Sequence, residues 1–106
     1  MGPFSHIIGF DWDKGNLDKN WEKHGVSNAE CEEVFFNAPL VVRPDPAHSG
    51  DEDRYFALGM TDERRALFLS FTLRSDKIRV ISSRDMTTRE MEVYSDRLKK
   101  NAKVQK

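Results

Sequence analysis

The stretch ALFLSFTLRSDKIRVISSR (residues 66–84) decides the fold that this sequence predicts. Two runs rich in aliphatic and aromatic residues flank a short polar segment, which is the pattern of two antiparallel strands joined by a turn. In the first run Leu67, Leu69 and Phe71 point to one side of the strand, because successive side chains alternate. The stretch therefore predicts a β-hairpin with one face packed on a core.

Apolar runs on both sides of this hairpin predict the other strands. RYFALGM (Arg54–Met60) precedes it across the polar turn TDERR (residues 61–65), as in a β-meander. LVVRP (residues 40–44) predicts a further strand or an extended edge, and HIIGFDW (residues 6–12) predicts a short first strand. The polar segment DPAHSGDED (residues 45–53) contains Pro and Gly and is predicted to be a loop.

A first helix is predicted between a cap at Asp13 or Asn16 and His24. Leu17, Trp21 and His24 share one face of this helix, so Trp21 is expected in the core. His24 has two interpretations. It is either a partly buried structural histidine, favoured as a cation at the carbonyl end of the helix, or a group for acid–base work.

The sequence KHGVSNAE (residues 23–30) predicts the junction between this helix and a second one. Gly25 allows the positive φ of a Schellman turn, with Val26 as its apolar cover. Ser27 and Glu30 match a capping box, and the second helix ends at the following proline.

A third helix is predicted from Met86 to about Lys103. Thr87 and Glu90 repeat the capping box, and Met91, Tyr94 and Leu98 form the apolar stripe.

We therefore expect an α+β domain over residues 1–106, with an antiparallel sheet of four to five strands, two N-terminal helices and one C-terminal helix. The helices are expected to cover one sheet face. Residues 1–5 are expected to be an added or disordered segment, and residues 101–106 a frayed tail.

Composition excludes several classes of protein. No apolar run reaches the roughly 20 residues of a membrane span, and no signal peptide is evident, so we expect a cytoplasmic protein. The single Cys31 forms no internal disulfide and fits core packing, and the three histidines are too scattered for a zinc motif. We therefore expect no metal and no cofactor.

The net charge of −1 conceals an asymmetry. Residues 1–53 carry 4 Lys/Arg and 11 Asp/Glu, whereas residues 54–106 carry 13 Lys/Arg and 7 Asp/Glu. The basic half favours a polyanion as partner, although both halves can also interleave on a mixed solvated surface.

Strand alternation allows Arg54, Arg74, Arg79 and Arg84 to gather on one exposed sheet surface or its rim. A guanidinium binds phosphate through two parallel hydrogen bonds. The alternative is that charged strand ends prevent edge-to-edge aggregation. Four more side chains are expected to face outward: Ser70 and Thr72 on one strand, and Ile81 and Ser83 on the next. Ser70 and Thr72 are the candidates among them for RNA contacts.

With these residues in view, the chain resembles the BrnT family of type II toxins, distant relatives of RelE-like messenger-RNA interferases. The resemblance covers about residues 10–94 and rests on the motifs FDWD (10–13), Asn20 with KHGVS (23–27), GDEDR (50–54), T-x-R (72–74), RVISSR (79–84) and then Arg89, Glu90 and Tyr94. The chain departs from the family pattern at Asn28 and Met86, which are not charged site residues.

The resemblance implies a small metal-independent endoribonuclease that inhibits translation. It also implies neutralisation by a ribbon-helix-helix antitoxin of the BrnA type, which binds operator DNA.

RNA cleavage by the ribose 2′-OH needs a base, an acid, and cations for the phosphorane. The candidates for these catalytic roles are Arg54, Arg74, Arg84, Arg79, His24 and Tyr94, and those for RNA contacts are Lys23, Ser70, Thr72 and Arg89. A non-catalytic RNA- or partner-binding module of the same fold is the alternative function, and core packing is the alternative for Tyr94.

Overall fold

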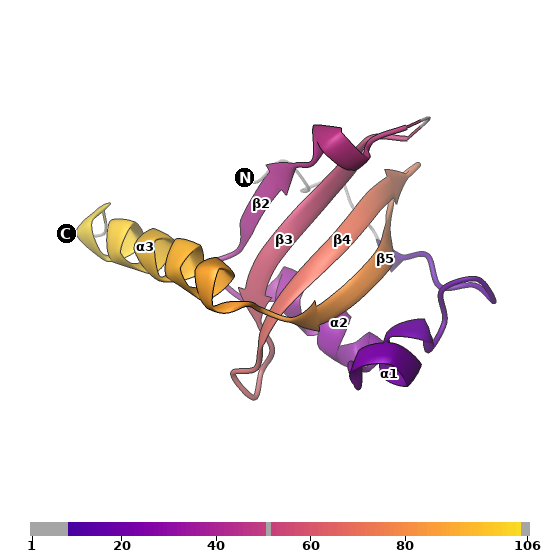
Figure 1. Cartoon of the computed structure of the whole chain (residues 1–106), viewed down its shortest axis with the longest axis horizontal. Coiled ribbons are helices and arrows are strands. Elements are labelled where there is room, and N and C mark those ends of the chain that lie inside the picture. Colours follow the sequence, from indigo (N-terminus) through magenta and orange to yellow (C-terminus); the bar gives the residue numbers. More distant parts are fainter. Residues whose placement is uncertain (1–8, 51, 105–106) are drawn as a thin grey trace.

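The computed structural model contains a five-stranded sheet with helices on both of its faces (Figure 1). The structure describes residues 9–50 and 52–104. Its elements in chain order are β1 (Gly9–Phe10), α1 (Lys19–His24), α2 (Asn28–Phe36), β2 (Val41–Pro44), the short 3-10 helix η1 (Pro46–His48), β3 (Arg54–Met60), β4 (Ala66–Arg74), β5 (Lys77–Asp85) and α3 (Thr88–Val104).

The strands lie in the order β1-β5-β4-β3-β2. Strands β2 to β5 form the predicted antiparallel meander, and the predicted bounds of β3 and β4 are confirmed. The expectation of a wholly antiparallel sheet is wrong, because β1 pairs in parallel with β5. This pairing brings together the first and the last strand of the chain, and no local sequence pattern predicts it. Residues 6–8 of the predicted first strand lie outside the described residues.

A β-bulge interrupts the pairing of β4 with β5. Ser70 lies opposite Ser82 while Phe71 lies opposite Val80, so Ile81 is an extra residue in β5. A bulge of one residue reverses the alternation beyond it. Ser83 is therefore turned inward and fully buried, and its expected outward position is wrong.

The main core lies between α2 and one face of the sheet. Cys31 and Val34 of α2 pack against Leu69, Phe71 and Val80 of the central strands. The expected core face of β4 is thus confirmed. Burial raises the pKa of the Cys31 thiol to about 11, which suits packing rather than nucleophilic chemistry.

A smaller cluster lies on the opposite face, where Tyr94 of α3 packs against Val41 and Leu58. The expectation that all helices cover one face is therefore wrong. Residues Ala57 and Leu58 are consecutive and point to opposite sides, so β3 contributes to both clusters. In Figure 1 α3 leaves the end of β5 and extends away from the sheet, so most of this second face is not covered by a helix.

The helix ends follow the predicted local chemistry. Gly25 has φ of 64°, its N–H donates to the Trp21 carbonyl at 3.0 Å, and the Val26 N–H donates to the Asn20 carbonyl at 3.2 Å. Val26 is fully buried, which completes the Schellman turn. Both predicted capping boxes are also present, at the starts of α2 and α3.

Helix α1 is shorter than predicted and presents a polar side to the sheet. The Asn16 amide donates to the Val80 carbonyl at 3.1 Å, and the Asn20 amide oxygen accepts from the Ser83 N–H at 2.9 Å. β1 pairs only with Lys77 and Ile78 of β5, and the two asparagine side chains hydrogen-bond to the β5 backbone further along the same edge. This orientation turns Trp21 outward, where 60% of it is exposed, so its expected core position is wrong.

Candidate functional site

The face of the sheet opposite α2 gathers the predicted arginines. Arg54 lies opposite Thr72, and Thr72 lies opposite Arg79, so these three side chains form one row across β3, β4 and β5. Directly opposed residues point to the same side of a sheet. We name this side the open face, and its exposed or half-buried members on β2 to β5 are Arg43, Arg54, Phe56, Met60, Ala66, Phe68, Ser70, Arg74, Lys77, Arg79, Ser82 and Arg84.

Arg79 is bound to carboxylates that follow β1. Its two terminal nitrogens donate to Asp13 at 2.7 and 3.1 Å, and Asp11 lies 3.6 Å away. The Arg79 side chain is only 15% exposed. The hydrogen bond from Arg79 is the main reason why the pKa of Asp13 is below its ordinary value. Arg79 therefore holds the segment after β1 against the sheet.

Arg84 is also held by several contacts. Two of its nitrogens donate to Glu90 at 2.8 and 3.0 Å, and the guanidinium carbon lies 4.2 Å from the centroid of the Phe68 ring. The same Glu90 accepts from the Thr87 N–H in the capping box. The hydrogen bonds from Arg84 hold the pKa of Glu90 below its ordinary value. Arg84 thus connects β5, β4 and the first turn of α3.

Arg74 and Arg54 are less constrained. Arg74 pairs with Glu52 at 3.0 and 3.3 Å, but both side chains are about half exposed, and exposed ion pairs of this kind are weak. Within residues 9–50 and 52–100, Arg54 forms no side-chain hydrogen bond or ion pair. Its guanidinium is thus the arginine group of this row that is most available to a phosphate.

Two predicted RNA contacts on β4 differ in their exposure. Thr72 is buried, and its hydroxyl donates to the Asp53 carbonyl at 2.8 Å. Its expected exposure is wrong, because Arg54 and Arg79 flank it in the same row. Ser70, one pair further along the strand, is half-buried and belongs to the open face.

An open groove of about 380 Å³ lies between the open face and the first turns of α3. Its floor includes Phe56 and Phe68, whose rings stack at a centroid distance of 5.6 Å and an interplanar angle of 19°. Arg89 and Val93 line it from α3, and Asp45 lines it from the end of β2. The groove combines an aromatic floor with charged edges, so it suits a flat group that carries charge.

The other predicted site residues lie elsewhere. Tyr94 is buried in the second cluster, and its hydroxyl donates to the Pro39 carbonyl at 2.8 Å, so the packing alternative describes its position. Burial raises its pKa. Lys23 and His24 are exposed at the end of α1 and do not join the arginines of the open face. A catalytic role for His24 or Tyr94 stays a prediction.

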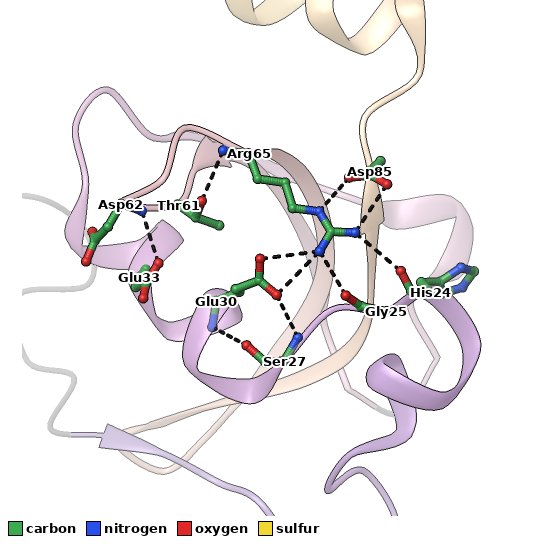
Figure 2. Close-up of polar contacts among 9 residues, drawn as sticks. All are labelled: His24, Gly25, Ser27, Glu30, Glu33, Thr61, Asp62, Arg65 and Asp85. Atoms are coloured by element: carbon green, nitrogen blue, oxygen red, sulfur yellow. Dashed lines mark hydrogen bonds and ion pairs between the residues drawn. The ribbon is translucent and has the colours of Figure 1, made fainter.

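Sequence reasoning missed Arg65, which organises the side of the sheet nearest to His24 (Figure 2). Its guanidinium donates to Asp85 at 2.8 Å, to the Gly25 carbonyl at 2.8 Å, and to the His24 carbonyl at 3.3 Å. It also pairs with Glu30 at 3.3 Å. One arginine therefore caps the carbonyl end of α1 and connects it to α2 and β5. Its partners lie 20 or more residues away, so no local pattern points to them.

Comparison with known families matches residues 12–90 to the family described as "Ribonuclease toxin, BrnT, of type II toxin-antitoxin system". The chain belongs to the BrnT family. The match includes the four predicted arginines and ends in the first turn of α3. A comparison with curated proteins finds no match. The resemblance inferred from the sequence is confirmed, and membership of the BrnT family implies an RNA substrate and an antitoxin partner.

Two further observations concern the described residues alone. Within them, no group of three or more His, Cys, Asp or Glu side chains is placed to hold a metal ion. No helix in residues 9–50 and 52–104 has the length and apolar character needed to cross a membrane.

Proposed function

We propose that this chain is a toxin that cleaves RNA on the open face, without a metal ion, through attack of a ribose 2′-OH on the adjacent phosphate. The observation that carries the proposal is the row formed by Arg54, Thr72 and Arg79 on the side of the sheet that α2 leaves uncovered. Preorganised cations at a developing phosphorane are among the strongest contributors to phosphate chemistry. The family's description as a ribonuclease toxin supports the choice of RNA as substrate.

The arginines divide into two roles in this proposal. Arg54 and Arg74 bind the scissile phosphate and stabilise its transition state, because neither is held in a buried ion pair. Arg79 and Arg84 are positioning residues, since their guanidiniums are already occupied by Asp13 and Glu90. Ser70 and Arg89 contact the RNA from the strand and from α3, and Lys23 contacts a longer RNA beyond the face.

The wider system follows from the family and is part of the proposal. The fold is RelE-like, the cleaved RNA is messenger RNA in the cytoplasm, and the result is inhibition of translation. A ribbon-helix-helix antitoxin of the BrnA type neutralises the toxin and carries the complex to operator DNA. Family membership supports this account.

The test is an RNA-cleavage assay in EDTA with purified protein freed of antitoxin. The readout is fragments that end in a 2′,3′-cyclic phosphate and a 5′-hydroxyl. Wild type is expected to produce them, and the Arg54→Ala/Arg74→Ala double variant is expected to be at least about 10²-fold slower. Arg64→Ala is the matched control, because Arg64 is an exposed arginine of the β3–β4 turn and lies outside the open face.

The alternative outcomes are distinct. RNA binding without fragments, both on free RNA and on translating ribosomes, would favour the non-catalytic binding module. Equal cleavage by wild type and the double variant would place the reaction away from Arg54 and Arg74.

A further inference from the structure

A histidine–carboxylate pair lies at the Arg54 end of the open face. The imidazole Nδ1 of His48 lies 2.9 Å from the Asp45 carboxylate, across the short helix η1. A carboxylate only accepts hydrogen bonds, so in the neutral ring Nδ1 carries the proton and Nε2 keeps its lone pair. The His48 side chain is 70% exposed, whereas Asp45 is 21% exposed. The carboxylate thus orients a ring whose basic nitrogen is accessible to a ligand.

The backbone ties this pair directly to Arg54. The Asp45 N–H donates to the Arg54 carbonyl at 2.8 Å, and the Arg54 N–H donates to the Ser49 hydroxyl at 2.9 Å. That hydroxyl in turn donates to the Asp45 carbonyl at 3.0 Å. Asp45 and Ser49, which flank η1, therefore bind the backbone carbonyl and the backbone N–H of Arg54, respectively. The turn that carries the proton acceptor is thus hydrogen-bonded to the backbone of an arginine whose guanidinium forms no hydrogen bond or ion pair within the described residues.

The same carboxylate reaches the groove. Asp45 lines it together with the stacked rings of Phe56 and Phe68. In the inferred complex a base contacts the groove at these rings, and its ribose and phosphate extend toward Asp45, whose backbone N–H donates to the Arg54 carbonyl. Aromatic side chains commonly bind bases of single-stranded RNA in this way.

We propose that His48, oriented by Asp45, is the general base of the cleavage reaction, and this inference rests on the proposed ribonuclease function. Nε2 takes the proton of the ribose 2′-OH, and the 2′-oxygen forms a bond to phosphorus. The bond from phosphorus to the 5′-oxygen breaks, and the 5′-oxygen takes a proton from water. The products are a 2′,3′-cyclic phosphate and a 5′-hydroxyl, and His48 returns its proton to solvent.

His24 does not have the same surroundings. Among the described residues its ring forms no hydrogen bond, and its carbonyl is engaged by Arg65 on the side of the sheet that α2 covers. The pair of His48 with Asp45 is therefore the better arrangement for accepting a proton beside the phosphate-binding arginines.

The experiment compares cleavage by wild type, His48→Ala, Asp45→Asn and His24→Ala. His48→Ala is expected to cleave about 10²–10⁴-fold more slowly. It should keep the wild-type affinity for a 2′-O-methyl RNA, which binds but has no 2′-OH to attack. Added imidazole should restore part of the rate of His48→Ala and leave Arg54→Ala unchanged. Asp45→Asn is expected to lose less than His48→Ala, because the ring remains.

Three results would overturn the inference. The first is a wild-type rate for His48→Ala. The second is a slow His48→Ala variant that imidazole does not rescue and that has lost affinity for the 2′-O-methyl RNA, which would indicate a structural role. The third is a larger loss for His24→Ala than for His48→Ala. Absence of cleavage by wild type, on free RNA and on ribosomes, would instead defeat the proposed function itself and this inference with it.

Discussion

The guanidinium of Arg84 lies over the Phe68 ring, 4.2 Å from its centroid, while two of its nitrogens bind Glu90. This single side chain joins the end of β5 to the middle of the sheet and to the start of α3. The contact ties the first turn of α3 to the sheet, and Tyr94 is the one buried side chain among those described in this helix. Arg84 also supports the groove from outside, because its partners Phe68 and Glu90 both line it.

Arg84→Ala is expected to lower the free energy of unfolding by about 1–3 kcal/mol, because it leaves a partly buried carboxylate unpaired and removes a cation–π contact. Urea denaturation measures this change. Arg54→Ala is the control and should stay within about 0.5 kcal/mol of wild type, since the Arg54 side chain forms no hydrogen bond or ion pair with the described residues. Equal stability of Arg84→Ala and wild type would contradict a structural role.

The Arg84–Glu90 pair also predicts a pH dependence. Arg84 and the capping-box N–H hold the pKa of Glu90 below its ordinary value of 4.5. A carboxyl with a lowered pKa in the folded state stabilises the protein above the unfolded value and loses this effect as the pH falls through the folded value. The stability gap between wild type and Glu90→Gln should therefore be largest at neutral pH and shrink in acid. A gap that stays constant from pH 7 to about pH 3 would contradict this.

Arg65 should matter for stability more than its sequence position in a polar turn suggests. Arg65→Ala removes the bonds to Asp85 and Glu30 and leaves two carbonyls of α1 without their partner. The expected loss is about 1–3 kcal/mol in urea denaturation. Arg64→Ala, at the exposed neighbouring position, should change stability by less than about 0.5 kcal/mol. Similar losses in both variants would argue against a special role for Arg65.

Gly25 is predicted to be hard to replace by a β-branched residue. Its φ of 64° is unfavourable for such residues, although a Cβ would meet no atom within 4 Å. Gly25→Val should therefore destabilise the protein by more than about 1 kcal/mol through the backbone alone. Gly25→Asn is the control, because Asn tolerates this conformation better. A wild-type melting temperature for Gly25→Val would be incompatible with the observed turn.

The features predicted correctly from the sequence are those encoded over a few residues. The strands Arg54–Met60 and Ala66–Arg74 follow from alternation and turn residues, and the Schellman turn at Gly25 and both capping boxes follow from their local motifs. Strand period allowed the arginines to share a face but left the side of Arg54 open, and Arg84 reaches the face of Arg79 only because of the bulge in β5.

The features that were missed depend on distant parts of the chain. The parallel pairing of β1 with β5 joins residues 68 positions apart, as in Gly9 with Lys77. The bulge at Ile81 reverses Ser83, and Asn20 takes the inward position on α1 that Trp21 was expected to occupy. None of these has a local signature. The same holds for the Asp13 carboxylate that binds Arg79, 66 positions away in the sequence.

The most direct test of the account is to locate bound RNA on the folded protein. We would titrate isotope-labelled protein with a 2′-O-methyl RNA and follow the backbone amide signals by nuclear magnetic resonance. The account predicts the largest shift changes at Arg54, Ser70, Ser82 and Arg89, with small changes in α2. Shift changes confined to α1 and α2, with the strands unaffected, would contradict the central claim that the open face binds RNA.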